Sequence, residues 1–150
     1  PSKEELYLSA LSVVIEEMSA LINDAMLVTV DALASLDRLT DAVVDYFAAH
    51  PPAAKLLLYE LLSSGPFMRA GGTQSVQRMM EQSVSLISLL TSDDKDRATE
   101  KAMSIFGMHL LYFAASDITS RFKGRDIFSQ DEVELRKVAL RQQMRQIIMN

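Results

Sequence analysis

The sequence contains no cysteine and no tryptophan, and only five of its 150 residues are glycine and four are proline. Without cysteine the chain has no disulfide framework and no thiolate chemistry. The scarcity of turn-forming residues, with 49% apolar residues, is typical of a packed helical domain rather than a sheet protein. The sequence therefore predicts an all-α fold in a single domain, residues 1–150.

The chain also lacks a long apolar run and an excess of basic residues. The longest run, residues 105–115, is interrupted by His109 and is shorter than the roughly 20 residues that a membrane-spanning helix needs. The first residues are charged, unlike a signal peptide. Twenty acidic against fifteen basic residues give a formal charge of −5, which disfavours binding to duplex DNA. We expect a soluble, cytoplasmic protein with no membrane partner.

Apolar residues at three- and four-residue spacing predict about six helices in an orthogonal or antiparallel bundle. Their expected ranges are 2 to about 34, 36–49, 52–63, 73–90, 94–123 and 130 to about 149, with a loop at 67–72. Helix starts are indicated by capping-box patterns at Ser2 with Glu5 and at Ser129 with Glu132. Thr73 is a further candidate cap, and Gly124 is placed to end the fifth helix.

The fifth and last predicted helices each carry two apolar sides, which one small domain cannot easily cover. On the fifth helix one side holds Met103, Gly107, Leu110, Leu111, Ala114 and Ile118, and the other holds Ile105, Phe106, His109, Tyr112, Phe113 and Ser116. A second subunit is the natural cover for the additional sides. We therefore expect a homodimer in which the last two helices of each copy form a four-helix bundle.

Three segments resemble landmarks of the TetR family of transcriptional regulators. Pro1-Ser2-Lys3-Glu4-Glu5-Leu6-Tyr7 is similar to the point where the helix-turn-helix ends and the effector domain begins. Leu36-Asp37-Arg38-Leu39 with Tyr46-Phe47-Ala48-Ala49-His50-Pro51 resembles the second effector helix and the break after it. Phe122-Lys123-Gly124-Arg125-Asp126-Ile127-Phe128-Ser129 resembles the turn between the dimerisation helices, with Ile127 where members often have proline.

The resemblance implies an all-helical effector-binding domain that dimerises through its last two helices and holds a small apolar or amphipathic molecule among the earlier ones. It also implies a regulator, most often a repressor, that contacts DNA only through a helix-turn-helix absent from this chain. The expected pocket residues are Met18, Ile22, Phe47, Met79, Ser83, Ile87, Gly107, Leu110 and Ala114. The expected dimer residues are Phe106, His109, Tyr112, Phe113, Ser116, Leu135, Val138, Ala139, Gln142 and Gln146.

Candidate chemistry is sparse, so we expect no enzyme, no cofactor and no metal. Phe47 and Phe106 precede His50 and His109 by three residues, where a helical metal site would need a ligand. No Ser-His-Asp set or phosphate-binding loop is present. Ser83 is either a polar ligand contact or a hydroxyl bonded to its own helix, and Gly107 either leaves room for a ligand or permits close helix packing. The alternative function is a helical module that associates with proteins and binds no ligand.

Overall fold

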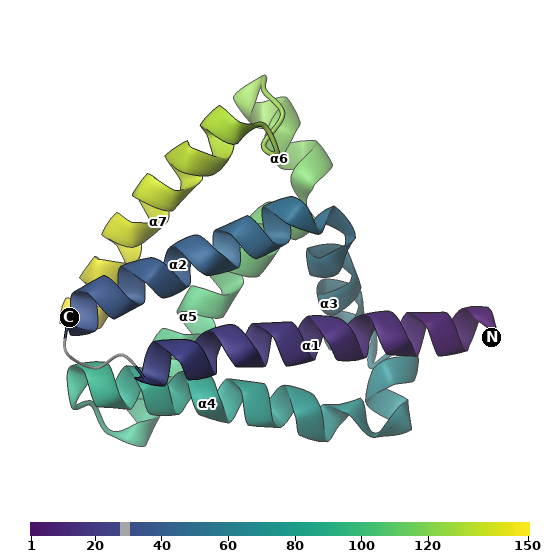
Figure 1. The fold of residues 1–150 in the computed structure, drawn as a ribbon, viewed down its shortest axis with the longest axis horizontal. Coiled ribbons are helices and arrows are strands. Elements are labelled where there is room, and N and C mark those ends of the chain that lie inside the picture. Colours follow the sequence, from purple (N-terminus) through teal and green to yellow (C-terminus); the bar gives the residue numbers. More distant parts are fainter. Residues whose placement is uncertain (28–30) are drawn as a thin grey trace.

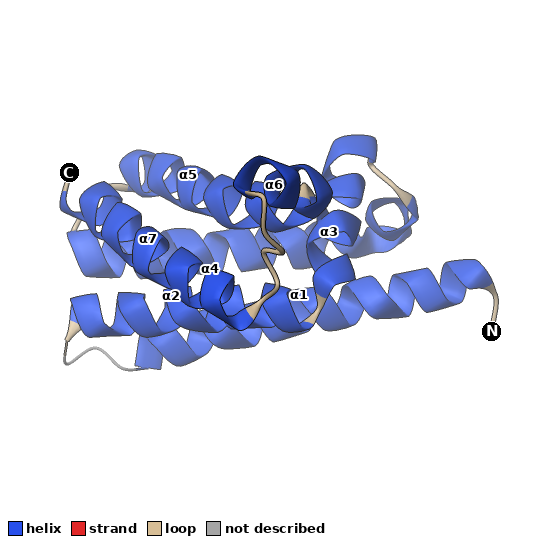
Figure 2. Cartoon of the chain, turned by 90° about the horizontal axis from the view of Figure 1, so that it is seen from above, coloured by secondary structure: helices blue, strands red, loops and turns tan. Residues whose placement is uncertain are grey.

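The computed structural model describes residues 1–27 and 31–150 and confirms the all-α prediction for that part of the chain. Figure 2 shows that helices make up nearly all of it. The elements are α1 (Lys3–Leu27), α2 (Ala32–Ala49), α3 (Pro51–Ser63), the π-helical turn η1 (Met68–Gly72), α4 (Thr73–Thr91), α5 (Lys95–Ala114), α6 (Ser116–Lys123) and α7 (Gln130–Met149). None of these helices is long and apolar enough to cross a membrane.

Two predicted helix boundaries are wrong. The first helix ends at Leu27 rather than near Ala34, and Asp31 caps α2 through a 3.1 Å bond from the Ala34 N–H to its carboxylate. Residues 28–30, which the prediction placed in the first helix, lie outside the described residues. The predicted fifth helix is two helices, because Ala115 leaves the helical conformation (φ −91°, ψ 32°) without any glycine or proline to mark the break.

Two of the four predicted start and stop signals are confirmed and two are wrong. Ser2 and Glu5 form the expected reciprocal capping box, with bonds of 2.9 and 3.1 Å, and Gly124 adopts the left-handed conformation (φ 66°) that ends α6. The Ser129 hydroxyl makes no cap. Glu132 does not reach back to the Ser129 N–H either, because it is buried and pairs with Lys123 and Arg125. Thr73 is likewise no cap, since its own backbone is helical and its hydroxyl donates to the Met68 carbonyl.

The helices pack in two neighbouring pairs joined by α5. Figure 1 shows α1 beside α4 and α2 beside α7, and both pairs are in contact. α5 contacts α2, α3, α4 and α7, and α6 forms the corner where the chain turns from α5 towards α7 (Figure 2). α5 thus contacts both pairs, as α3 does through α1 and α2, and the pairs also contact each other directly through α1 and α2.

Acidic side chains of α2 meet basic side chains of α7. Arg141 makes two bonds to Asp41, of 2.7 and 2.6 Å, and the Lys137 Nζ lies 2.7 Å from Asp45. Arg145 similarly pairs with Asp37. These charges hold α2 against α7 at the partly exposed edge of the bundle, where each pair stabilises modestly.

Apolar burial divides into two clusters. The larger one has fully buried members on α1, α2, α3, α5 and α7, including Leu11, Val44, Phe113 and Leu140. The smaller one comprises Leu36, Ile87, Ala98, Ala102, Met144 and Ile148. Side chains of both clusters line the cavity described below, so the apolar interior is hollow where the clusters approach one another.

A buried carboxylate connects the beginning of α1 to α3 and η1. Glu60 is 2% exposed, accepts a 2.5 Å bond from the Tyr7 hydroxyl, and also accepts from the backbone N–H groups of Phe67 and Met68. Burial and the neighbouring carboxylate raise the pKa of Tyr7. Gly65 is required here, because a Cβ at that position would lie 2.4 Å from a carboxylate oxygen of Glu60.

Candidate functional site

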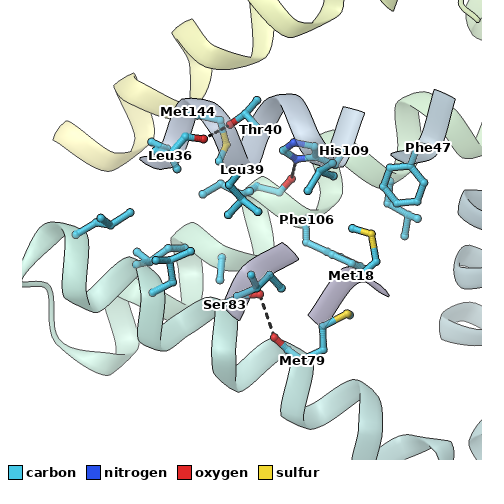
Figure 3. Close-up of a pocket in the computed structure, with 18 of the residues that line it drawn as sticks. Met18, Leu36, Leu39, Thr40, Phe47, Met79, Ser83, Phe106, His109 and Met144 are labelled. Atoms are coloured by element: carbon cyan, nitrogen blue, oxygen red, sulfur yellow. Dashed lines mark hydrogen bonds between the residues drawn. The ribbon is translucent and has the colours of Figure 1, made fainter. Parts of the chain in front are cut away.

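An apolar cavity of about 90 Å³ lies inside the bundle, and α1, α2, α3, α4, α5 and α7 all contribute to its walls. A single water molecule needs about 10–15 Å³ on this scale, and voids larger than that are few in a close-packed domain. Figure 3 shows side chains converging on this space from opposite sides, with Thr40 and His109 on one side and Met79 and Ser83 on the other. The cavity is therefore the structural feature best suited to hold a ligand.

Most of the predicted pocket residues do line this cavity. They are Met18, Ile22, Phe47, Met79, Ser83, Ile87 and Leu110. Six of these seven lie on α1, α2 and α4, where a single apolar side must face the interior. On such helices the periodicity of the sequence alone fixes the direction of the side chains.

Two predicted pocket residues lie elsewhere. Gly107 is exposed, and a Cβ built on it would meet nothing within 4 Å, so it neither opens the cavity nor permits close packing within this chain. Ala114 is half-buried against the larger apolar cluster and does not line the cavity. Leu110 was assigned to the same side of α5 and does line the cavity, so only part of that side faces the interior.

The predicted dimer residues of α5 and α6 mostly face the interior of the chain. Phe106 and His109 line the cavity, while Phe113 and Ser116 are buried within the chain at 0% and 5% exposure. His109, Phe113 and Ser116 are therefore not surface residues available to a second subunit, and Phe106 is only partly exposed. Tyr112 is half-buried beneath the Arg136 guanidinium, whose carbon lies 3.9 Å from the ring centre. The aromatic side of α5 faces inward because aromatic side chains gain most from burial.

The predicted dimer residues of α7 are placed differently. Leu135 and Val138 are exposed at 50% and 49%, Gln142 and Gln146 are also exposed, and Ala139 is half-buried. Four large apolar residues of α5 and α6 are exposed: Met103, Leu111, Ile118 and Phe122, of which Phe122 is 88% exposed. We call the exposed apolar residues of α5 and α6 and those of α7, Leu135 and Val138, the two exposed stripes.

Other cavity residues were not anticipated from the sequence. They are Leu36, Leu39, Thr40, Val43, Leu57, Leu86, Leu90, Ala102, Ile105 and Met144. Leu36 to Val43 belong to α2, whose apolar residues recur at the spacing that also identified Phe47. Met144 is the cavity residue that α7 contributes. It could not be anticipated, because no sequence pattern indicates the ion pairs that hold α7 against α2.

His109 is the most distinctive polar residue of the cavity. Its side chain is buried, and its Nδ1 lies 2.9 Å from the Ile105 carbonyl one turn earlier. Its Nε2 has no hydrogen-bond partner among the described residues. Burial, reinforced by the charge of Arg136, lowers the pKa of His109 to about 4. The imidazole is consequently neutral near pH 7.

The two hydroxyl groups of the cavity already donate to their own helices. The Thr40 hydroxyl donates to the Leu36 carbonyl at 2.8 Å, and the Ser83 hydroxyl donates to the Met79 carbonyl at 3.0 Å (Figure 3). Ser83 thus makes the local bond anticipated as one alternative while also lining the cavity. Each oxygen keeps lone pairs with which it can accept a further bond.

The second histidine, His50, lies at the end of α2. His50 is exposed, and both its backbone N–H and its Nδ1 lie 3.0 Å from the Tyr46 carbonyl at the end of α2. Among residues 1–27 and 31–150 no group of three or more His, Cys, Asp or Glu side chains is arranged to hold a metal ion.

Comparison with known proteins adds no relative: no family model matches the chain, and no curated protein or solved structure is significantly similar to it.

Proposed function

We propose that this chain is the effector-binding and dimerisation domain of a TetR-like transcriptional regulator, most simply a repressor. The observation that carries the proposal is the apolar cavity, which is walled by six helices and contains a few polar atoms. Small-molecule sites are typically concave and apolar with a small number of convergent polar groups. The resemblance of three sequence segments to that family supplies the regulatory part of the proposal.

The ligand would act on α1, which contributes Met18 and Ile22 to the cavity wall. A ligand changes the population of two conformations only by binding one of them more tightly. In the proposal the filled and empty cavities favour different positions of α1 relative to α4, its neighbour. A helix-turn-helix attached before α1 would then be reoriented, and DNA binding would reside there rather than in this acidic domain.

The exposed stripes support self-association through α5, α6 and α7. Large apolar side chains that are exposed together mark interaction surfaces more often than scattered ones do. The expected complex is a homodimer in which these helices form a four-helix bundle. A protein of this design works in the cytoplasm and needs no catalytic residue.

A helical association module without a ligand is the second candidate, and the exposed stripes favour it as much as the first. Stabilisation by small uncharged aromatic molecules distinguishes the two. A ligand that binds only the native state raises its stability by RT ln(1 + [L]/Kd), so the melting temperature should increase with ligand concentration. No stabilisation by any member of a broad library of such molecules would favour the association module.

A further inference from the structure

The polar side chains that line the cavity all direct their hydrogens to backbone carbonyls of their own helices. The Ile105 carbonyl can only accept, so the His109 Nδ1 facing it at 2.9 Å must carry the hydrogen. The neutral ring then presents a lone pair at Nε2. This atom is buried and has no partner among the described residues, so His109, one of the side chains that line the cavity, carries an unsatisfied acceptor.

The rest of the wall does not offset this acceptor character. The hydroxyl protons of Thr40 and Ser83 bond to carbonyls of their own helices, which leaves the oxygen lone pairs. No charged side chain lines the cavity among the described residues. An anionic ligand would therefore lose its hydration, find no cation and face lone pairs, while a cationic one would find no carboxylate.

We propose that the cavity takes an uncharged, mainly apolar molecule that donates one hydrogen bond to the Nε2 of His109. A phenol with a short alkyl chain has this chemistry, and carboxylates and phosphates do not. The inference rests on the proposed ligand-binding function and specifies its substrate class. A buried acceptor left unpaired is costly, so a ligand lacking the donor should be disfavoured.

The size of the cavity limits the ligand to a small molecule. Its volume of about 90 Å³ is below the 150 Å³ of an engineered cavity that admits benzene. Met18, Met79 and Met144 line it, and unbranched methionine side chains can move to enlarge such a space. A single substituted ring is therefore an appropriate probe, and larger polycyclic compounds are not.

The test uses 4-propylphenol as the donor probe, with 4-propylanisole as an ether of similar shape and 4-propylbenzoate as an anion. Calorimetry should give wild-type affinity that is about tenfold higher for the phenol than for the ether, with no measurable binding of the benzoate. In His109→Phe the phenol-to-ether ratio should fall about tenfold. His50→Phe is the matched control, because His50 makes the same Nδ1 contact but is exposed, and it should retain the wild-type ratio.

A second measurement needs no variant. Long-range proton–nitrogen spectra of the whole chain should show the His109 Nε2 unprotonated near pH 7, and 4-propylphenol should shift its resonance while the His50 ring stays unchanged. Equal affinities for phenol and ether, with no effect of His109→Phe, would overturn the donor requirement and leave the ligand site intact. Failure of every probe to bind would contradict both proposals, and preferred binding of the benzoate would overturn this one.

Discussion

Two buried polar residues, Glu60 and His109, differ in how completely their hydrogen-bonding groups are satisfied. Glu60 and His109 are both almost completely buried, and neither forms an ion pair within the part of the chain that the structure describes. Glu60 is satisfied by three donors, while His109 has one bond and one free lone pair. A fully bonded group of this kind stabilises structure, and a half-bonded one is a candidate contact for a ligand.

Replacement of Glu60 should therefore reduce stability. In Glu60→Gln the shape is kept, but an NH₂ group faces one of the three donors that now bond the carboxylate. We expect the free energy of unfolding to fall by about 1–3 kcal/mol, because a buried donor loses its acceptor. Urea denaturation measures this. Glu100→Gln, an exposed substitution on α5, should leave the stability unchanged, and equal behaviour of the two variants would contradict the role assigned to Glu60.

His109 should make stability depend on pH in a defined direction. Its folded-state pKa is about 4 and its ordinary value is 6.5, so between these values the unfolded chain binds more protons. Stability contributed by this residue is then lost as the pH falls. We expect a loss of about 2 kcal/mol between about pH 7 and pH 5 in wild type, relative to the same interval in His109→Phe. Parallel pH profiles would show that the ring is not buried in its neutral form.

The boundaries and the inward-facing side of a single helix were predicted best where the helix has only one apolar side. The α2, α3 and α4 helices have one apolar side and carry proline or turn residues near their ends, and their boundaries fall within a few residues of the expected ones. The break at Ala115 has no such signal. On α5 two apolar sides compete, and periodicity cannot distinguish the side that packs inside from the side that remains exposed.

Gly107 gives an element-scale prediction that follows from the corrected orientation of α5. It lies mid-helix with open space where a Cβ would stand, so Gly107→Ala should raise the free energy of unfolding by about 0.5–1 kcal/mol. Gly72→Ala is the contrasting variant. Its Cβ would lie 2.3 Å from the Phe67 ring, so stability should fall. Urea denaturation at one fixed chain concentration compares them, and destabilisation by Gly107→Ala would place that residue in a packed contact.

At the scale of the whole molecule, the exposed stripes predict a homodimer. Leu111→Glu or Val138→Glu would place a charge in the proposed interface, and each should shift sedimentation from dimer to monomer without unfolding the chain. Leu62→Glu is the control, because Leu62 is 79% exposed on α3 and outside both stripes. A wild-type chain that sediments as a monomer at micromolar concentration would contradict the dimer.

The location of the cavity was also only partly predictable at this scale. Residues from α1, α2 and α4 were identified from periodicity, whereas the contributions of Met144 and of the aromatic side of α5 depend on how helices distant in the sequence meet. The α2–α7 ion pairs join residues about one hundred positions apart, such as Asp41 and Arg141. Such contacts have no local pattern, so the sequence alone does not reveal them.

The central claim is that the cavity binds a small molecule, and methionine methyl spectra test it most directly. Met18, Met79 and Met144 line the cavity, whereas Met103 and Met149 are 54% and 75% exposed and serve as internal references. Titration with 4-propylphenol should shift the methyl resonances of the first three and leave those of Met103 and Met149 unchanged. Shifts confined to Met103 and Met149, or none at saturating probe, would contradict the account.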